Sequence, residues 1–218
     1  MALTLLQKLN DMVGDIDSSI DVASHMAYAH RELIDALPAN LLAKHVIPKT
    51  AVSTHTVSDS SQDHRVVLVV INAGEGKRPA RMETYDRFAD FKVGSESIYA
   101  TTKLTPVWYL KNAAGTTTID YEPPVVSITE LDVYMAKYLD FLTTTTPDST
   151  SIPEFPNTAI YAFLLSTAIR IMQAKIALSV DEDEDGELLQ LYQAEVQNLT
   201  GLYQAELATL AKENNPAT

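Results

Sequence analysis

Residues 157–179 are the most apolar stretch of the chain and constrain its fold more than any other feature. Written as a helix, this stretch has apolar side chains over much more than one stripe: Ile160, Phe163, Leu164, Leu165, Ile169, Ile171, Met172 and Ile176. Arg170 and Lys175 interrupt it, whereas a membrane span of this length should be nearly free of charge. The stretch therefore predicts a helix buried on more than one side, either at the centre of its own bundle or against another subunit.

The helices that could cover it lie near both ends of the chain. Leu5, Leu9, Met12 and Ile16 recur every three or four residues, which predicts an amphipathic helix. A second helix should follow Ser18-x-x-Asp21, which resembles a capping box, and end before Pro38. The last helix, about 187–210, carries its own apolar stripe, formed by Leu188, Tyr192, Val196, Leu199, Tyr203, Leu207 and Leu210.

The middle of the chain is different in character. Residues 66–71 are a β-branched run typical of a buried strand, and further strands are expected at 81–85, 106–110, 116–121 and 128–138. Turn residues at 72–76 and 112–115 predict hairpin connections. The fold class is therefore expected to be α+β, a helical bundle of N- and C-terminal helices with an inserted antiparallel β module. The expected segments are 1–43, 44–142, a polar connector at 143–156, and 157–218.

Charge and cysteine content exclude several classes of protein. The chain has 16 basic and 29 acidic residues, a net charge of −13, which disfavours a protein that wraps nucleic acid. It has no cysteine, so disulfide scaffolds and thiolate metal sites are excluded. Its N-terminus lacks the basic and apolar regions of a signal peptide. We expect a soluble protein from a reducing compartment, without membrane association or cofactor.

The acidic turn that begins at Asp181 resembles part of a calcium loop. Asp181, Asp183 and Asp185 occupy ligand positions 1, 3 and 5, and Gly186 occupies the turn position. Position 12, where a bidentate Glu is needed, is Tyr192. We therefore expect a loop without metal that faces solvent. The alternative is a calcium-regulated cellular interaction module built on residues 181–192.

Two further groups of residues are candidates for contact surfaces. Lys77, Arg78 and Arg81 belong to the only basic cluster, which is either a solvated loop or a contact for an acidic partner. Trp108 and Tyr109 belong to an aromatic-rich sheet, which indicates a core or a protein interface. The sequence contains no nucleophile elbow, phosphate loop or paired acid and base, so an enzyme is not expected.

The order of these features resembles the head-to-tail adaptor (connector) proteins of tailed bacteriophages. Four stretches carry the resemblance: the N-terminal helix pair ending in residues 29–38, AHRELIDALP; the sheet segment 105–109, TPVWY; the strand that enters prolines at 119–124, IDYEPP; and the final helices with 159–168, AIYAFLLSTA, and 191–195, LYQAE. Together they span most of the chain as an ordered pattern.

The resemblance implies a structural protein of the virion neck that is assembled in the bacterial host cytoplasm. A homo-oligomeric ring of about twelve copies would bind the portal protein on one side and a tail or neck protein on the other. Genome DNA would leave through the lumen of this ring, and the acidic turn at Asp181, Asp183 and Asp185 would face either that lumen or solvent. It implies a portal-side interface at Tyr203, Leu207, Leu210 and Lys212, and a tail-side or intersubunit interface at Lys77, Arg78, Arg81, Trp108 and Tyr109. The polar C-terminal end is expected to reach the portal, so deleting residues 210–218 should spare the fold and abolish portal binding.

The missing ligand at Tyr192 gives a direct test of the acidic turn. We expect thermal melts recorded with calcium and with a chelator to superimpose, because a full set of oxygens cannot close around the ion. Replacing Asp181, Asp183 and Asp185 together with Asn should change the melting temperature little. A large rise in melting temperature with micromolar calcium that the triple variant lacks would contradict this expectation.

Overall fold

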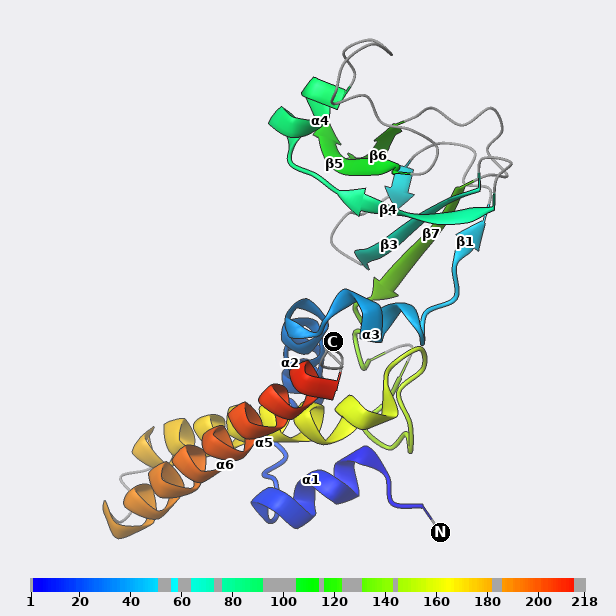
Figure 1. The fold of residues 1–218 in the computed structure, drawn as a ribbon. Coiled ribbons are helices and arrows are strands. Elements are labelled where there is room, and N and C mark those ends of the chain that lie inside the picture. The colour runs from blue at the N-terminus through cyan, green and yellow to red at the C-terminus, as the bar shows by residue number, and fades with distance from the viewer. Residues whose placement is uncertain are drawn as a thin grey trace. The chain divides into compact units, whose positions relative to one another are not determined.

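The computed structural model describes residues 2–50, 56–58, 64–72, 76–91, 105–113, 116–122, 131–142, 145–181 and 186–213. The chain divides into two compact units. One, the helical unit, combines Met1–His45 with Tyr138–Thr218, and the other, the sheet unit, is Val46–Lys137. Helices from both ends of the chain thus share one unit, and a sheet is inserted between them, which makes the fold α+β (Figure 1).

The helical unit contains three N-terminal helices, α1 (Leu5–Val13), α2 (Val22–Ala36) and α3 (Ala39–Ala43). After the inserted sheet come a 3-10 turn (Asn157–Ala159), α5 (Ile160–Asp181) and α6 (Gly186–Glu213). The helix α5 packs against α1, α2 and α6, and α6 runs back along α5 as a long hairpin (Figure 1). The expected helices at 157–179 and 187–210 are confirmed, whereas α3 directly after Pro38 was not expected.

The buried side chains of α5 form the centre of this unit. They include Ala162, Phe163, Leu164, Leu165, Ala168, Ile171 and Met172. The most apolar 18 consecutive residues of Asn157–Val180 have a mean hydropathy of 1.4, which is high enough for a membrane-spanning helix. Half of these residues are buried within the fold. Both cations of α5 have partners in the N-terminal segment, since Arg170 pairs with Glu32 at 2.7 Å and Lys175 donates to the Val13 and Asp15 carbonyls at 2.7 and 2.6 Å. These contacts favour a core helix.

The ends of α1 and α2 are capped by specific side chains. Thr4 and Gln7 form a reciprocal capping box at the start of α1, and its first two amides donate to the Ser149 and Pro147 carbonyls. At α2 the expected box beginning at Ser18 is wrong. Asp21 itself is the N-cap and accepts from the Ser24 amide, because an aspartate oxygen reaches that amide directly.

An aromatic cluster is buried in the helical unit. His30 of α2 is buried, with its ring within 6.2 Å of three phenylalanine rings, those of Phe141, Phe155 and Phe163. Two of these rings come from the segment between the last strand and α5. That segment, which includes the expected polar connector, therefore contributes to the core of the helical unit and does not merely link two parts.

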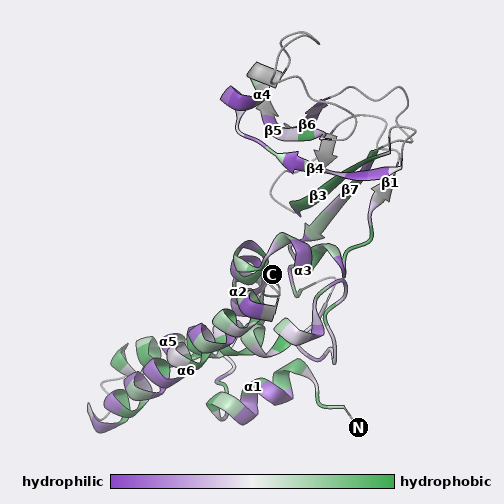
Figure 2. Cartoon of the chain, viewed as in Figure 1, coloured by the Kyte–Doolittle hydropathy of each residue, from purple (hydrophilic) through white to green (hydrophobic). Residues whose placement is uncertain are grey.

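The sheet unit contains β1 (Lys49–Thr50), β2 (Thr56–Ser58), β3 (His64–Asn72), β4 (Lys77–Met82), β5 (Val107–Ala113), β6 (Thr116–Glu122) and β7 (Leu131–Lys137). Their order is β1-β7-β3-β4-β5-β6-β2. The two expected hairpins are confirmed, as Asn72 pairs with Lys77 and Ala113 with Thr116. Figure 2 shows apolar β3 beside hydrophilic β4.

The strand β4 changes its partner along its length. Lys77–Ala80 pair with β3 antiparallel, whereas Arg81 and Met82 pair with β5 in parallel. The expected antiparallel module is thus wrong for the pair β4 and β5, whereas the other strand pairs that the structure describes are antiparallel. A parallel partner requires a long crossover, and here that crossover contains α4 (Tyr85–Phe91), where the sequence had indicated the end of a strand.

The environment of His30 predicts a pH-dependent stability. Burial lowers the pKa of His30 to about 4, against about 6.5 in an unfolded chain. As the pH decreases, His30 is therefore protonated in the unfolded state before it is protonated in the folded state. The contribution of neutral His30 to the free energy of unfolding is fully present above pH 6.5 and is lost as the pH decreases toward 4, by roughly 3 kcal/mol in total. Urea unfolding of the wild type across this range should show this loss, and His30→Gln should lack it.

Carboxylates also titrate in this range. The informative quantity is therefore the difference in the free energy of unfolding between the wild type and His30→Gln at each pH. His25→Gln is the matched control, because His25 is only partly buried and lies outside the aromatic cluster. It should retain most of the wild-type pH dependence. Parallel stability curves for the wild type and His30→Gln would show that His30 does not titrate in this way.

Candidate interaction surfaces

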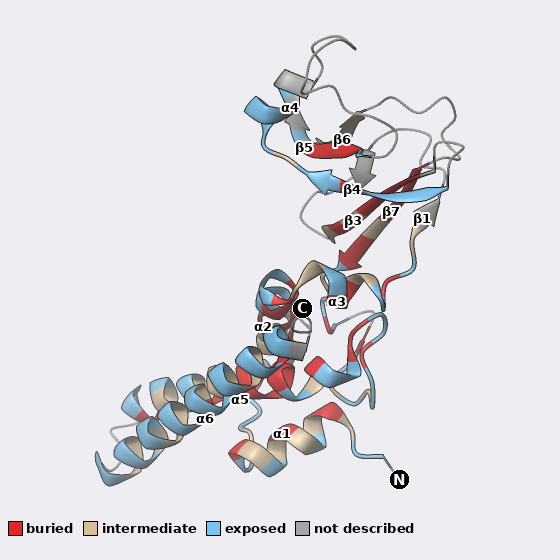
Figure 3. Cartoon of the chain, viewed as in Figure 1, coloured by how far each residue is buried: buried red, intermediate tan, exposed pale blue. Residues whose placement is uncertain are grey.

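The basic cluster lies on strand β4, not in a loop. Of the six residues Lys77–Met82, only Ala80 is buried. Lys77 pairs with Asp132 of β7 at 2.7 Å, which raises the pKa of Lys77 through the hydrogen bond and the opposite charge. Arg81 pairs with Glu83 at 2.5 Å. Figure 3 shows β4 as an exposed strand next to the buried strands β3 and β7.

Trp108 and Tyr109 do not form one aromatic surface, because successive residues of a strand point to opposite faces. Trp108 is buried in the main core with Val69, Ile71 and Ile119, and its indole donates to the Ala80 carbonyl at 3.1 Å. Tyr109 lies on the opposite face, where Tyr85 of α4 packs against it with ring centroids 5.6 Å apart. Both side chains are buried within their own chain and are not free contact surfaces.

Most of the expected portal-side residues lie on the packed side of α6. Burial raises the pKa of Tyr203, whose hydroxyl hydrogen-bonds with Ser166 of α5. Leu207 is half-buried and Leu210 is buried, whereas Lys212 is exposed. Deleting residues 210–218 would remove Leu210, whose side chain is buried. This burial argues against the expectation that the deletion spares the fold, which stays a prediction. A truncation that spares the fold must begin after Glu213, where α6 ends.

The outward side of α6 has a feature that the sequence reading missed. Between Glu187 and Lys212, every exposed residue of this helix is uncharged. These residues are Gln190, Leu191, Gln193, Ala194, Gln197, Asn198, Gly201, Leu202, Gln204, Ala205, Ala208, Thr209 and Ala211. The solvent face of a helix is usually charged. Spacing alone could have revealed this surface, because the apolar stripe of α6 leaves these positions outside.

The negative charge of the chain is concentrated in the helical unit. That unit has 6 basic and 18 acidic residues, a net charge of −12, whereas the sheet unit has 10 basic and 11 acidic residues, a net charge of −1. From residue 176 to residue 211 there are 8 acidic residues and no Lys or Arg. Residues 176–211, which include the turn of the α5–α6 hairpin, thus carry acidic side chains without Lys or Arg, whereas Arg170, Lys175 and Lys212 lie outside this range.

The acidic turn lies largely outside the described residues. Asp181 is the last residue of α5, while Asp183 and Asp185 are among the residues that the structure does not describe. Within the described ranges, no three His, Asp or Glu side chains are grouped to hold a metal ion. The calcium alternative and the solvated-loop expectation both remain predictions.

Comparison with protein-family models, with curated proteins and with solved structures finds no match for this chain. The arguments about its function therefore rest on the residues and contacts described above.

The Lys77–Asp132 pair gives a test of the sheet unit. Asp132 is buried, so removing its cation leaves a carboxylate with poor solvation. Lys77→Met should therefore lower the unfolding temperature of the sheet unit. Arg78→Met is the matched control, because this neighbouring arginine is exposed and outside both ion pairs, and it should change that temperature little.

Trp108 provides the signal for this measurement. It is the only tryptophan of the chain and is buried in the core of the sheet unit, so its fluorescence follows the unfolding of that unit. Equal unfolding temperatures for Lys77→Met and Arg78→Met would show that the pair adds nothing to stability.

Proposed function

We propose that this protein is a structural component of a bacteriophage virion, not an enzyme. In this proposal it forms the head-to-tail adaptor ring that docks under the portal, joins the capsid to the tail in the neck, and lines the channel through which DNA is ejected. The proposal originates in the sequence resemblance to adaptor proteins. The observation that carries it furthest is the segregation of charge between the two units.

A net charge of −12 on the helical unit suits a surface that faces DNA without binding it. Duplex DNA is densely negative, and proteins that bind it neutralise phosphates with Lys and Arg. A channel wall built from a strongly acidic unit repels phosphates instead, so the duplex can move past without adhering. The near-neutral sheet unit lacks this charge and is assigned to contacts with proteins.

The outward side of α6 supports a contact with a protein partner. It is long, exposed and free of charge within a unit that is otherwise strongly acidic. Uncharged surfaces lose less hydration energy when they are buried, and interface centres are depleted of charge. We assign this surface and Lys212 to the portal side, in place of Tyr203, Leu207 and Leu210, which pack within the chain.

The proposal predicts binding to a portal ring. The purified chain, mixed with the portal protein of the same virus, should form a second ring on the portal that is visible by negative-stain electron microscopy. A chain that ends at Glu213 should keep the wild-type melting temperature and lose this binding, because the segment 214–218 is expected to reach the portal. A chain that ends at Thr209 should melt earlier, because it lacks buried Leu210.

The truncated chains separate two causes of failure. Loss of binding without loss of stability assigns the effect to the C-terminal segment. Full portal binding by the chain that ends at Glu213 would remove the role of that segment, and absence of binding by the complete chain would overturn the adaptor function.

A further inference from the structure

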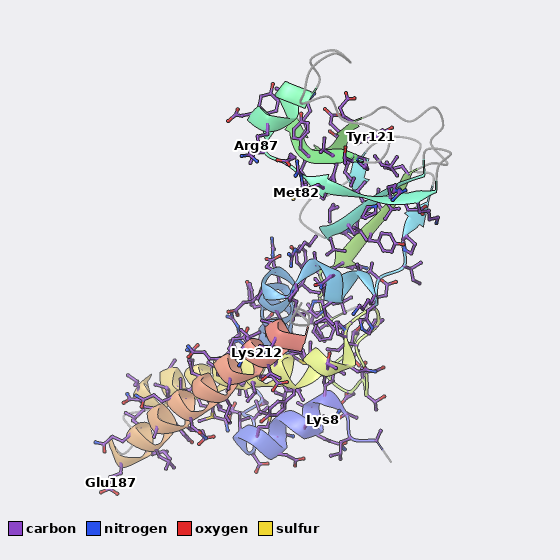
Figure 4. All side chains as sticks on the ribbon, viewed as in Figure 1. Lys8, Met82, Arg87, Tyr121, Glu187 and Lys212 are labelled. Atoms are coloured by element: carbon purple, nitrogen blue, oxygen red, sulfur yellow. The ribbon has the colours of Figure 1, made fainter. Side chains whose placement is uncertain are left out.

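The outward side of α6 carries a regular stripe of exposed residues, which we call the α6 stripe. It starts at Glu187, continues at alternating steps of four and three residues, and ends at Lys212 about seven helical turns later, so its members share one side of the helix. Between these ends it contains Leu191, Ala194, Asn198, Gly201, Ala205 and Ala208, all of them exposed. Figure 4 labels Glu187 and Lys212 near the opposite ends of α6.

The charges of the α6 stripe are confined to its two ends and have opposite signs. Glu187 lies in the first turn of α6 and Lys212 in the last turn. Glu195 and Glu206 are half-buried and lie about a quarter turn around the helix from the stripe. Glu213 follows Lys212 about 100° further around the helix. The stripe thus has an acidic end, a basic end and no charge between them.

Gly201, in the middle of the stripe, has no role that its own chain explains. It lies inside α6, where glycine is less favourable than alanine because its backbone loses more conformational freedom. A side chain at this position would meet nothing within 4 Å, so packing within the chain does not require glycine. The missing side chain does allow another helix to approach closely, because the distance between packed helices depends on the side chains at the contact. Gly201 therefore indicates a partner helix that crosses α6 at this point.

We infer that the α6 stripe of one copy binds the α6 stripe of a second copy, with the two helices antiparallel. A two-fold axis midway between Asn198 and Gly201 places Glu187 of each copy opposite Lys212 of the other, so both ends of the contact join opposite charges. A parallel pair would place Glu187 against Glu187 and Lys212 against Lys212. The antiparallel pair also aligns the helix dipoles favourably. Such a contact is isologous and closes at two copies.

The side-chain sizes along the stripe match in this register. Leu191, which is 64% exposed in its own chain, lies opposite small Ala208, and this occurs twice because of the two-fold axis. Asn198 lies opposite Gly201 at the centre, where the helices are closest. The glutamines beside the stripe carry amides that both donate and accept, so the same amides of a second copy can satisfy them.

The net charge of the helical unit, −12, opposes the approach of two copies. This repulsion acts between charges spread over the unit, and at about 0.15 M salt it is screened beyond roughly 8 Å. The stripe itself brings uncharged side chains together and joins unlike charges at its ends. A different protein would need the same order of a basic end, an uncharged middle and an acidic end, which a second copy supplies by symmetry.

The pairing concerns the free protein and does not require the adaptor role. Under the proposed function this side of α6 faces the portal, so the portal and a second copy would compete for it. Only that competition rests on the proposed function. Pairing would then keep the portal-binding side of free copies covered until the portal displaces one of them.

The end charges give a test with an internal rescue. Sedimentation equilibrium of the wild type at concentrations up to about 1 mM should show a monomer–dimer equilibrium. Glu187→Lys and Lys212→Glu should each weaken the dimer by about tenfold, because each places like charges opposite one another at both ends. An equimolar mixture of the two variants should restore it, since every end of the mixed pair joins Lys to Glu. Glu187→Lys reduces the net negative charge, so its weaker dimer cannot come from net repulsion.

Gly201 separates pairing from stability. Gly201→Gln should raise the melting temperature of the dilute chain, because it removes a helix glycine and meets no obstruction. It should abolish the dimer, because the added side chain keeps the helices apart. Ala177→Gln, at an exposed position of α5, is the matched control and should leave the dimer unchanged. A lower melting temperature with an unchanged dimer would assign Gly201 to the fold alone and overturn the inference.

The absence of cysteine allows the direction of the helices to be tested. Ala194→Cys and Ala205→Cys chains, one of them tagged, are mixed and treated with a short bismaleimide. In the antiparallel pair these two positions face each other, whereas like positions are roughly 16 Å apart along the helix. We expect the mixed dimer in about tenfold excess over the dimer of either chain with itself.

Three outcomes would overturn the inference: a wild type that stays monomeric, a larger oligomer that Gly201→Gln leaves intact, or crosslinks that join like positions in preference. A monomeric wild type whose portal binding is lost in Gly201→Gln would assign the stripe to the portal alone. The pairing experiments contain no portal, so their failure leaves the test of the adaptor function independent.

Discussion

The burial of α5 is the constraint on which the rest of the structure depends. Its apolar surface covers too wide an arc for one partner, and a buried Leu, Ile or Phe side chain contributes about 1.5–3 kcal/mol only when it is covered. The covering helices are α1 and α2 from the beginning of the chain and α6 from its end. Residues Val46–Lys137 leave this core and form the separate sheet unit, and the chain returns to the core from Tyr138 onward.

The cations on α5 determine how the N-terminal segment sits on it. Lys175 binds the Val13 and Asp15 carbonyls at the end of α1, where the helix dipole favours a positive charge. Arg170 binds Glu32 of α2. The two residues that argue against a membrane span in the sequence thus act in the structure as attachment points for the two helices that cover α5.

Much of the fold could be predicted from the sequence because its signals are local. The wide apolar arc of α5, the stripe of α6 and the β-branched run of β3 each lie within one segment. The missed elements depend on distant partners. Lys77–Met82 is charged and contains Pro79, so only its pairing with β3 and β5 makes it a strand. The helix α4 is short, and its place is set by the parallel crossover, which no local pattern shows.

Among the candidate interaction surfaces, too, some could be predicted from local sequence and others depend on residues far apart in the sequence. The basic cluster was visible in the sequence, but its orientation was not, because Asp132 lies 55 residues beyond Lys77. Trp108 and Tyr109 are adjacent in sequence and were grouped together, whereas the alternation of β5 places them on opposite faces. The uncharged side of α6 required no distant information. It is the set of positions that remains once the apolar stripe of α6 is assigned to α5.

Insertion of the sheet also separates the charges, and this limits how copies can meet. Two helical units of charge −12 repel each other at long range, whereas a helical unit and a near-neutral sheet unit with an outward basic strand do not. The net charges therefore oppose contact between two helical units more than contact between a helical unit and a sheet unit. The insertion of the sheet thus leaves nearly all of the net negative charge on one of the two units.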